Sequence, residues 1–157
     1  LTAPALPPTC PAAGTGIVDA TAAVNAAIGG TTTPTGPTIN ESESNNTTGT
    51  ADLVTTTGTT VNGNMGSTSD SDYFRVDLPA GKTLSSVMTP NSSSDYDLYV
   101  YNSNGSLLAK SENGSGSVDS VSVTNTGTST FARYIRVVYY SGGTGSTNGK
   151  YTLKLSW

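Results

Sequence analysis

Two short acidic segments carry residue types that suit a metal ion. Residues 41–46, "ESESNN", place carboxylates beside side-chain amides, and residues 70–72, "DSD", add a second pair of carboxylates. The oxygen-bearing residues of the two segments are Glu41, Glu43, Asn45, Asn46, Asp70 and Asp72. Calcium is a hard ion that takes about six to eight oxygen ligands. A fold that brings the two segments together would give it a suitable site.

A simpler interpretation of these residues is that Glu41 and Glu43 keep a linker solvated and that Asp70 begins a turn. The pattern is not that of an EF-hand, because Phe74 stands where the next ligand would follow Asp72. On spacing alone, the simpler interpretation is favoured over a calcium site.

Catalysis by this chain alone is not expected. The sequence has no histidine, so it cannot form a Ser-His-Asp or Cys-His arrangement or the usual His/Cys zinc site. Asp95 and Asp97 could be paired for acid–base work. Alternation along a strand puts both carboxylates on one exposed face, with no apolar pocket to raise either pKa. No Gly-rich stretch has the spacing of a phosphate-binding loop.

Composition narrows the classes of partner and the compartment. Acidic residues outnumber Lys and Arg by 11 to 7, which gives a net charge of −4 and disfavours nucleic acid and anionic membranes. The surface, rich in Thr, Ser and Asn, suggests an extracellular protein. The single cysteine, Cys10, could pair with another chain or with a missing part of this one, or it could be a lone thiol.

The sequence divides into a short helical region, a linker and a strand-rich region. Residues 17–28, "IVDATAAVNAAI", predict a helix that ends at Gly29-Gly30. Residues 29–40 are a Gly/Thr/Pro linker with nothing to bury. Residues 41–157 alternate apolar and polar side chains between turn signals. We therefore expect an all-β fold there, an antiparallel, jelly-roll-like β-sandwich, preceded by the short helix and the linker.

About eight strands account for this alternation. They are expected at residues 59–65, 72–78, 83–89, 95–101, 107–110, 118–123, 131–140 and 150–157. In "DYDLYVY" (95–101), Tyr96, Leu98 and Val100 should face the core and Tyr99 and Tyr101 should face outward. The following "NSNG" favours a hairpin turn.

Residues 41–157 resemble the bacterial pre-peptidase C-terminal domain, a β-sandwich related to the collagen-binding domains of clostridial collagenases. The resemblance lies in the acidic Asn-Asn start, "SDSDYFRVDLPAG", "SDYDLYVY" and the closing "GKYTLKLSW". It implies calcium at Glu41, Glu43 and Asn45, with Asp70 and Asp72 supplied by a nearby loop. With the resemblance added, calcium becomes the favoured interpretation. Asn46 stands where some relatives carry Asp, so one anionic ligand is missing.

The front of the chain resembles a different family. Residues 10–28, "CPAAGTGIVDATAAVNAAI", are similar to the last segment of the catalytic domain in secreted subtilisin-like proteases. The resemblance implies that residues 1–28 are a remnant of such a domain, whose catalytic residues would lie upstream, and that Cys10 forms a disulfide with it. A coincidental match would leave the parent another kind of secreted enzyme.

Two functions fit these resemblances. The first is an accessory domain that holds insoluble protein such as collagen or keratin through exposed tyrosines, here Tyr99, Tyr101, Tyr134 and Tyr140. These tyrosines could equally just cover strand faces. The second is a processing segment that assists secretion and is then cut away in the linker. An adhesion or carbohydrate-binding module of another secreted enzyme is a further alternative.

Overall fold

The structure is a computed structural model that describes residues 35–157. The predicted helix at 17–28, Cys10 and the first half of the predicted linker, residues 29–34, lie outside the described residues. So does every other feature of the remnant predicted at 1–28.

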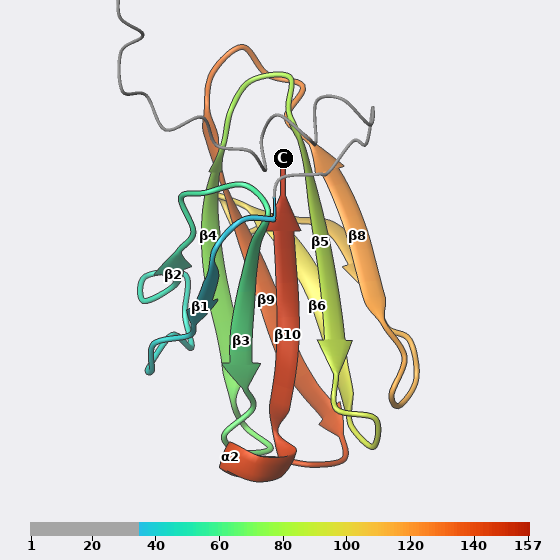
Figure 1. The fold of residues 1–157 in the computed structure, drawn as a ribbon. Coiled ribbons are helices and arrows are strands. Elements are labelled where there is room, and N and C mark those ends of the chain that lie inside the picture. The colour runs from blue at the N-terminus through green and yellow to red at the C-terminus, as the bar shows by residue number, and fades with distance from the viewer. Residues whose placement is uncertain (1–34) are drawn as a thin grey trace, which may run out of the picture. The chain divides into compact units, whose positions relative to one another are not determined.

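Two five-stranded sheets pack face to face (Figure 1). The first has the order β1-β3-β10-β5-β8 and the second the order β2-β4-β9-β6-β7. The strands of the first sheet are β1 (Thr38–Asn40), β3 (Thr59–Asn64), β10 (Lys150–Ser156), β5 (Thr83–Pro90) and β8 (Asp119–Thr124). Those of the second are β2 (Asp52–Leu53), β4 (Ser71–Leu78), β9 (Phe131–Ser141), β6 (Asp95–Asn102) and β7 (Leu107–Ser111). The predicted β-sandwich is confirmed, and all eight predicted strands are present.

Alternating side chains of the two sheets form one core. In β6, Tyr96, Leu98 and Val100 are fully buried, whereas Tyr99 and Tyr101 are only partly buried, as the alternation predicts. The fully buried side chains of the first sheet include Val61, Leu84, Met88, Leu153 and Leu155. Removal of this apolar surface from water is the main term that stabilises the sandwich.

The structure adds two edge strands that the sequence did not predict. β1 lies within the predicted linker and pairs in parallel with β3, and β2 pairs in parallel with β4. Each sheet is therefore mixed rather than purely antiparallel. These strands are only 3 and 2 residues long, too short for alternation to reveal them. Each of them forms by pairing with the edge of a longer strand.

A one-turn helix, α2 (Gly145–Asn148), lies in the connection between β9 and β10. Its sequence, GSTN, has little helix propensity. Hydrogen bonds to Met65 hold both of its ends: the Gly145 N–H donates to the Met65 carbonyl at 2.8 Å, and the Met65 N–H donates to the Gly149 carbonyl at 2.8 Å. Tertiary contacts rather than local preference therefore form this turn.

Candidate metal centre

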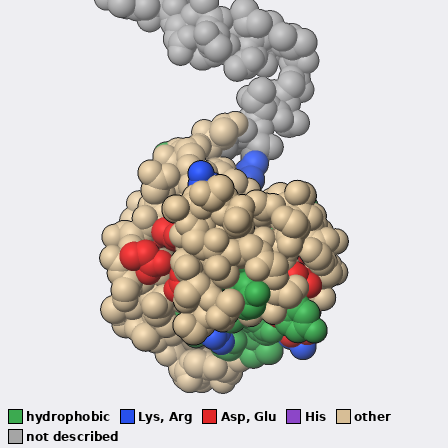
Figure 2. Space-filling view, turned by 90° about the horizontal axis from the view of Figure 1, so that it is seen from below, with side chains coloured by type: hydrophobic (Ala, Val, Ile, Leu, Met, Phe, Trp, Pro, Cys, Tyr) green, Lys and Arg blue, Asp and Glu red, His purple; other side chains and the backbone are tan. Residues whose placement is uncertain are grey.

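Edge pairing brings residues 41–46 to the start of β4. After β1, the Glu41 N–H donates to the carbonyl of Asn62 in β3 at 3.1 Å. Further along, the Asn45 carbonyl accepts the N–H of Tyr73 in β4 at 2.9 Å. The acidic segment is thus attached to both sheets and runs past Asp70 and Asp72. Figure 2 shows Asp and Glu side chains gathered on the side of the molecule where β1 and β2 lie.

Three carboxylates converge at this point. One oxygen each of Glu43, Asp70 and Asp72 lies within 4.8 Å of the other two. Asp70 and Asp72 are buried, whereas Glu43 is exposed. Neither of the two ion pairs formed within residues 35–157 involves any of these three residues. Their negative charge is therefore not neutralised by a neighbouring cation of this part of the chain.

Two buried oxygens at the site accept no hydrogen bond within residues 35–157. They are Asn45 Oδ1 and Asp72 Oδ1. The other atom of each group is held: Asn45 Nδ2 donates to Asp52 Oδ2 at 3.3 Å, and Asp72 Oδ2 accepts from the Tyr151 hydroxyl at 2.6 Å. A buried acceptor without a partner is destabilising. These oxygens, together with the converging carboxylates, are the donor set that a hard cation prefers.

Glu41 does not join the three converging carboxylates. Its Oε1 accepts the N–H of Asn64 at 2.6 Å, and its Oε2 lies 3.2 Å from the Tyr151 hydroxyl. Because that hydroxyl also contacts Asp72, Glu41 is connected to the site through Tyr151. The structure thus places Glu43, Asp70 and Asp72 together, Asn45 beside them on the same segment, and Glu41 one contact further away.

Burial changes the protonation of two of these groups. Burial, together with smaller contributions from the charges of Glu41 and Asp70, raises the pKa of Asp72 to about 8. Burial also raises the pKa of Glu41 to about 7, with a smaller contribution from Glu43. The ordinary pKa values of aspartate and glutamate side chains both lie near 4. The site therefore resists holding all its negative charge without a counter-charge.

The Asn46 side chain forms a hydrogen bond with Asp70. With its amide nitrogen turned toward the carboxylate, Asn46 Nδ2 donates to Asp70 Oδ1 at 2.8 Å and to the Ser71 carbonyl at 3.0 Å. An aspartate at this position could not donate these hydrogen bonds. In this chain residue 46 therefore orients a carboxylate instead of adding one.

Sequence reasoning missed Tyr151 and Asp52. Tyr151 is buried on the inner face of its strand, and alternation along that strand gives no indication that the hydroxyl reaches two carboxylates. One signal was available: Gly63 interrupts β3 opposite Tyr151, and glycine within a strand often marks a close approach. A Cβ at Gly63 would lie 2.0 Å from Tyr151 Cζ. Asp52 lies in a strand too short to predict.

A separate group of aromatic side chains lies on the outer face of the second sheet. We call Tyr99, Tyr101, Tyr134 and Tyr140 the tyrosine surface. Tyr101 pairs directly with Tyr134 across β6 and β9, and it stacks on Tyr99 with ring centroids 6.3 Å apart. The first three rings are partly buried, and Tyr140 is 70% exposed. All four tyrosines thus lie on one face.

Comparisons with known proteins agree with this fold. Residues 70–156 match the family described as the bacterial pre-peptidase C-terminal domain. Among solved structures, the pre-peptidase C-terminal domain of a collagenase from Bacillus anthracis is similar, with a TM-score of 0.50 and 14% sequence identity. The match covers 68% of this chain and 92% of that one. No curated protein matches the chain. Since the family match spans more than half of its length, the chain belongs to the bacterial pre-peptidase C-terminal domain family.

Proposed function

We propose that this chain is the non-catalytic C-terminal accessory domain of a secreted subtilisin-like serine protease, and that it holds insoluble protein substrate through the tyrosine surface. Family membership supports the accessory role, and the absence of histidine from the sequence fits a chain that leaves catalysis to another domain. In the part of the chain that the structure describes, no helix has the length and apolar character needed to span a membrane.

The clustering of tyrosines on a single sheet face carries the proposal. Tyrosine gives a large contact area at a small loss of conformational entropy, and aromatic side chains are enriched where proteins bind one another. One arginine side chain lies beside these rings: Arg136 pairs with Tyr99 across the sheet, and its guanidinium is 5.5 Å from the ring centroid of Tyr73, a tyrosine of the neighbouring strand β4. Such a face can contact both the apolar and the polar groups of an extended protein.

Calcium is the second part of the proposal. Glu43, Asp70 and Asp72 would hold the ion, with Asn45 contributing its unsatisfied amide oxygen. Glu41 would keep Tyr151 and Asp72 in place. The bound ion would supply the positive charge that these side chains lack. Because residues 41–46 connect β1 to the rest of the sandwich, calcium would stiffen the point where the sandwich begins.

Sedimentation with insoluble fibres tests substrate binding. We expect the full chain to sediment with collagen or keratin, and the double variant Tyr101→Ala/Tyr134→Ala to bind about tenfold more weakly, because two adjacent contact residues are lost. Val87→Ala is the matched control, since Val87 is a partly buried residue on the outer side of the opposite sheet. It should sediment like the parent chain.

Two results would contradict the proposal. One is that neither fibre retains the parent chain, and the other is that the double variant binds as tightly as Val87→Ala.

A further inference from the structure

A second acidic site, separate from the candidate metal centre, opens on the outer face of the second sheet. Asp95, Asp97, Glu112, Gly114 and Tyr140 line a pocket of about 450 Å³, which we call the acidic pocket. The sequence predicted that Asp95 and Asp97 would share an exposed face. They do share a face, but their exposures are only 8% and 9%, so the expectation of exposure was wrong. Neighbouring loops and side chains cover this end of β6.

A β-bulge places Tyr140 at the rim of the pocket. Asp95 pairs with Ser141, but the next residue, Tyr96, pairs with Tyr139, so Tyr140 is an extra residue in β9. Bulges redirect side chains and are common beside functional sites. Here the extra residue is the most exposed of the large hydrophobic side chains in the part of the chain described. The acidic pocket thus has an exposed aromatic ring at its edge.

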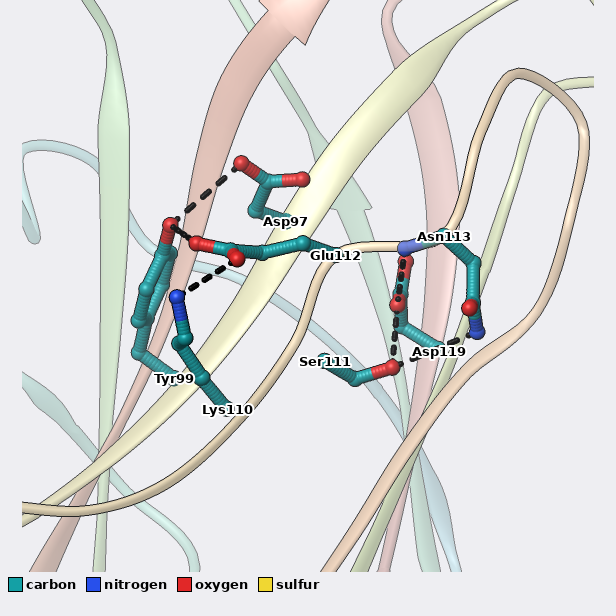
Figure 3. A network of polar contacts seen from close by, with 7 residues as sticks. All are labelled: Asp97, Tyr99, Lys110, Ser111, Glu112, Asn113 and Asp119. Atoms are coloured by element: carbon teal, nitrogen blue, oxygen red, sulfur yellow. Dashed lines mark hydrogen bonds and ion pairs between the residues drawn. The ribbon is translucent and has the colours of Figure 1, made fainter.

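The pocket carries more negative charge than its surroundings neutralise. Lys110 Nζ forms an ion pair with Glu112 Oε2 at 2.6 Å, and no other ion pair of residues 35–157 includes a pocket residue. The Tyr99 hydroxyl lies 2.6 Å from Glu112 Oε1 and 3.4 Å from Asp97 Oδ2, as Figure 3 shows. Burial, followed by the charges of Asp95 and Glu112, raises the pKa of Asp97. Of the three carboxylates of the pocket, only that of Glu112 thus forms an ion pair.

Asp95 indicates that the pocket is built to receive a cation. The residue as a whole is 8% exposed and lines the pocket. None of its hydrogen bonds to residues 35–157 involves the carboxylate. In the buried Asp119 nearby, one oxygen, Oδ1, accepts from the Ser111 hydroxyl and from the Asn113 N–H (Figure 3). The Asp95 oxygens are not among the fully enclosed side-chain atoms without a partner, so they are accessible from the pocket that this residue lines. A positively charged group in the pocket would supply the missing donors.

The spacing of the carboxylates favours an extended cation over a metal ion. Within the described residues, only Glu43, Asp70 and Asp72 bring three ligand atoms within 4.8 Å of one another. The pocket carboxylates are therefore more widely spread. A guanidinium group carries five N–H donors on a planar fork and stacks on aromatic rings, and Tyr140 offers such a ring.

We propose that the acidic pocket binds an arginine side chain of a protein held on the tyrosine surface. Tyr99 belongs to that surface and also contacts Asp97 and Glu112, so the two sites are continuous. The inference rests on the proposed function only in naming the source of the arginine. The pocket itself can be tested with a small peptide.

The test is an NMR titration of the full chain with the peptide acetyl-Gly-Gly-Arg-Gly-Gly-amide. A second peptide carries citrulline, which has nearly the shape of arginine but no charge. We expect the arginine peptide to shift the amide signals of residues 95–99, 112–114 and 138–141. The citrulline peptide should bind at least about tenfold more weakly, because charge-assisted hydrogen bonds are lost.

Isosteric variants assign the binding to the pocket. Asp95→Asn should weaken arginine binding by about tenfold for the same reason. Asp77→Asn is the matched control, because Asp77 lies on the same sheet face but pairs with Arg75 instead; it should leave the affinity unchanged. An unchanged amide spectrum outside the pocket confirms that each variant folds.

The proposal is overturned if the two peptides bind equally, or if Asp95→Asn and Asp77→Asn affect binding to the same extent. Its failure is distinct from failure of the proposed function. If the chain binds the arginine peptide but does not sediment with the fibres, the pocket proposal holds and the proposed source of the arginine is wrong. If the chain sediments with the fibres but the arginine peptide shifts none of its amide signals, the pocket proposal is overturned and the proposed function stands.

Discussion

At the scale of single residues, Tyr151 organises the candidate metal centre. Its hydroxyl sits between two carboxylates that come from segments far apart in the chain, Glu41 and Asp72. Burial, and then the charges of Asp72 and Glu41, raise the pKa of the Tyr151 hydroxyl, so it stays a donor throughout the physiological range. Without this donor, Asp72 would have no hydrogen-bond partner on either oxygen.

Removing the hydroxyl should therefore destabilise the chain. We expect Tyr151→Phe to lower the free energy of unfolding by about 1–3 kcal/mol, the usual effect of leaving a buried polar group unpaired. Urea unfolding monitored by circular dichroism measures it. Tyr139→Phe is the control, because that hydroxyl makes only a solvent-exposed contact of 3.3 Å with the Gly142 carbonyl. Equal stability of Tyr151→Phe and Tyr139→Phe would show that the buried contact is unimportant.

The residue types at the site were predictable and their partners were not. Oxygen-rich residues at 41–46 and 70–72 could be recognised from sequence, and the structure does bring Glu43, Asp70 and Asp72 together. The contact from Glu41 to Tyr151 could not be foreseen, because it joins residues 110 positions apart. Burial of Asp95 and Asp97 was missed for a related reason: alternation assigns a side chain to a face but does not reveal what covers that face.

At the scale of elements, the close approach of β3 and the β10 side chain Tyr151 shapes the candidate metal centre. Alternation was sufficient to predict the long strands, since each has one face in the core. The short edge strands β1 and β2 and the turn α2 depend on contacts with distant residues, which local patterns do not encode. The exact position of Tyr151 likewise depends on the glycine opposite it.

Gly63→Ala tests that dependence. A methyl group at Gly63 would overlap the Tyr151 ring, and such overpacking usually destabilises by about 1–3 kcal/mol. Thermal unfolding followed by circular dichroism should show the loss. Gly49→Ala is the control, because the nearest atom to a Cβ there is 3.7 Å away. We expect that variant to stay within about 0.5 kcal/mol of the parent. If Gly63→Ala and Gly49→Ala have the same melting temperature, the Tyr151 ring can move aside and the predicted dependence is wrong.

At the scale of the whole molecule, the acidic site links stability to pH and to calcium. The pKa values of Glu41 and Asp72 are raised in the folded chain. The folded chain therefore binds protons more tightly than the unfolded chain between about pH 4 and 8. Without metal, stability is therefore highest at the acidic end of this window and decreases as the pH rises. Calcium requires ionised carboxylates, so its stabilising effect should increase over the same range.

The melting temperature of the full chain, measured at pH 5 and pH 8 with excess calcium and with a chelator, tests the calcium centre most directly. With chelator, melting should occur at a lower temperature at pH 8 than at pH 5. Calcium at about 100 times its Kd should raise the pH 8 value by about 10 °C and the pH 5 value much less. Asp72→Asn should abolish the calcium effect, whereas Asp77→Asn should preserve it. Identical melting of the parent chain with calcium and with chelator at pH 8 would contradict the calcium centre.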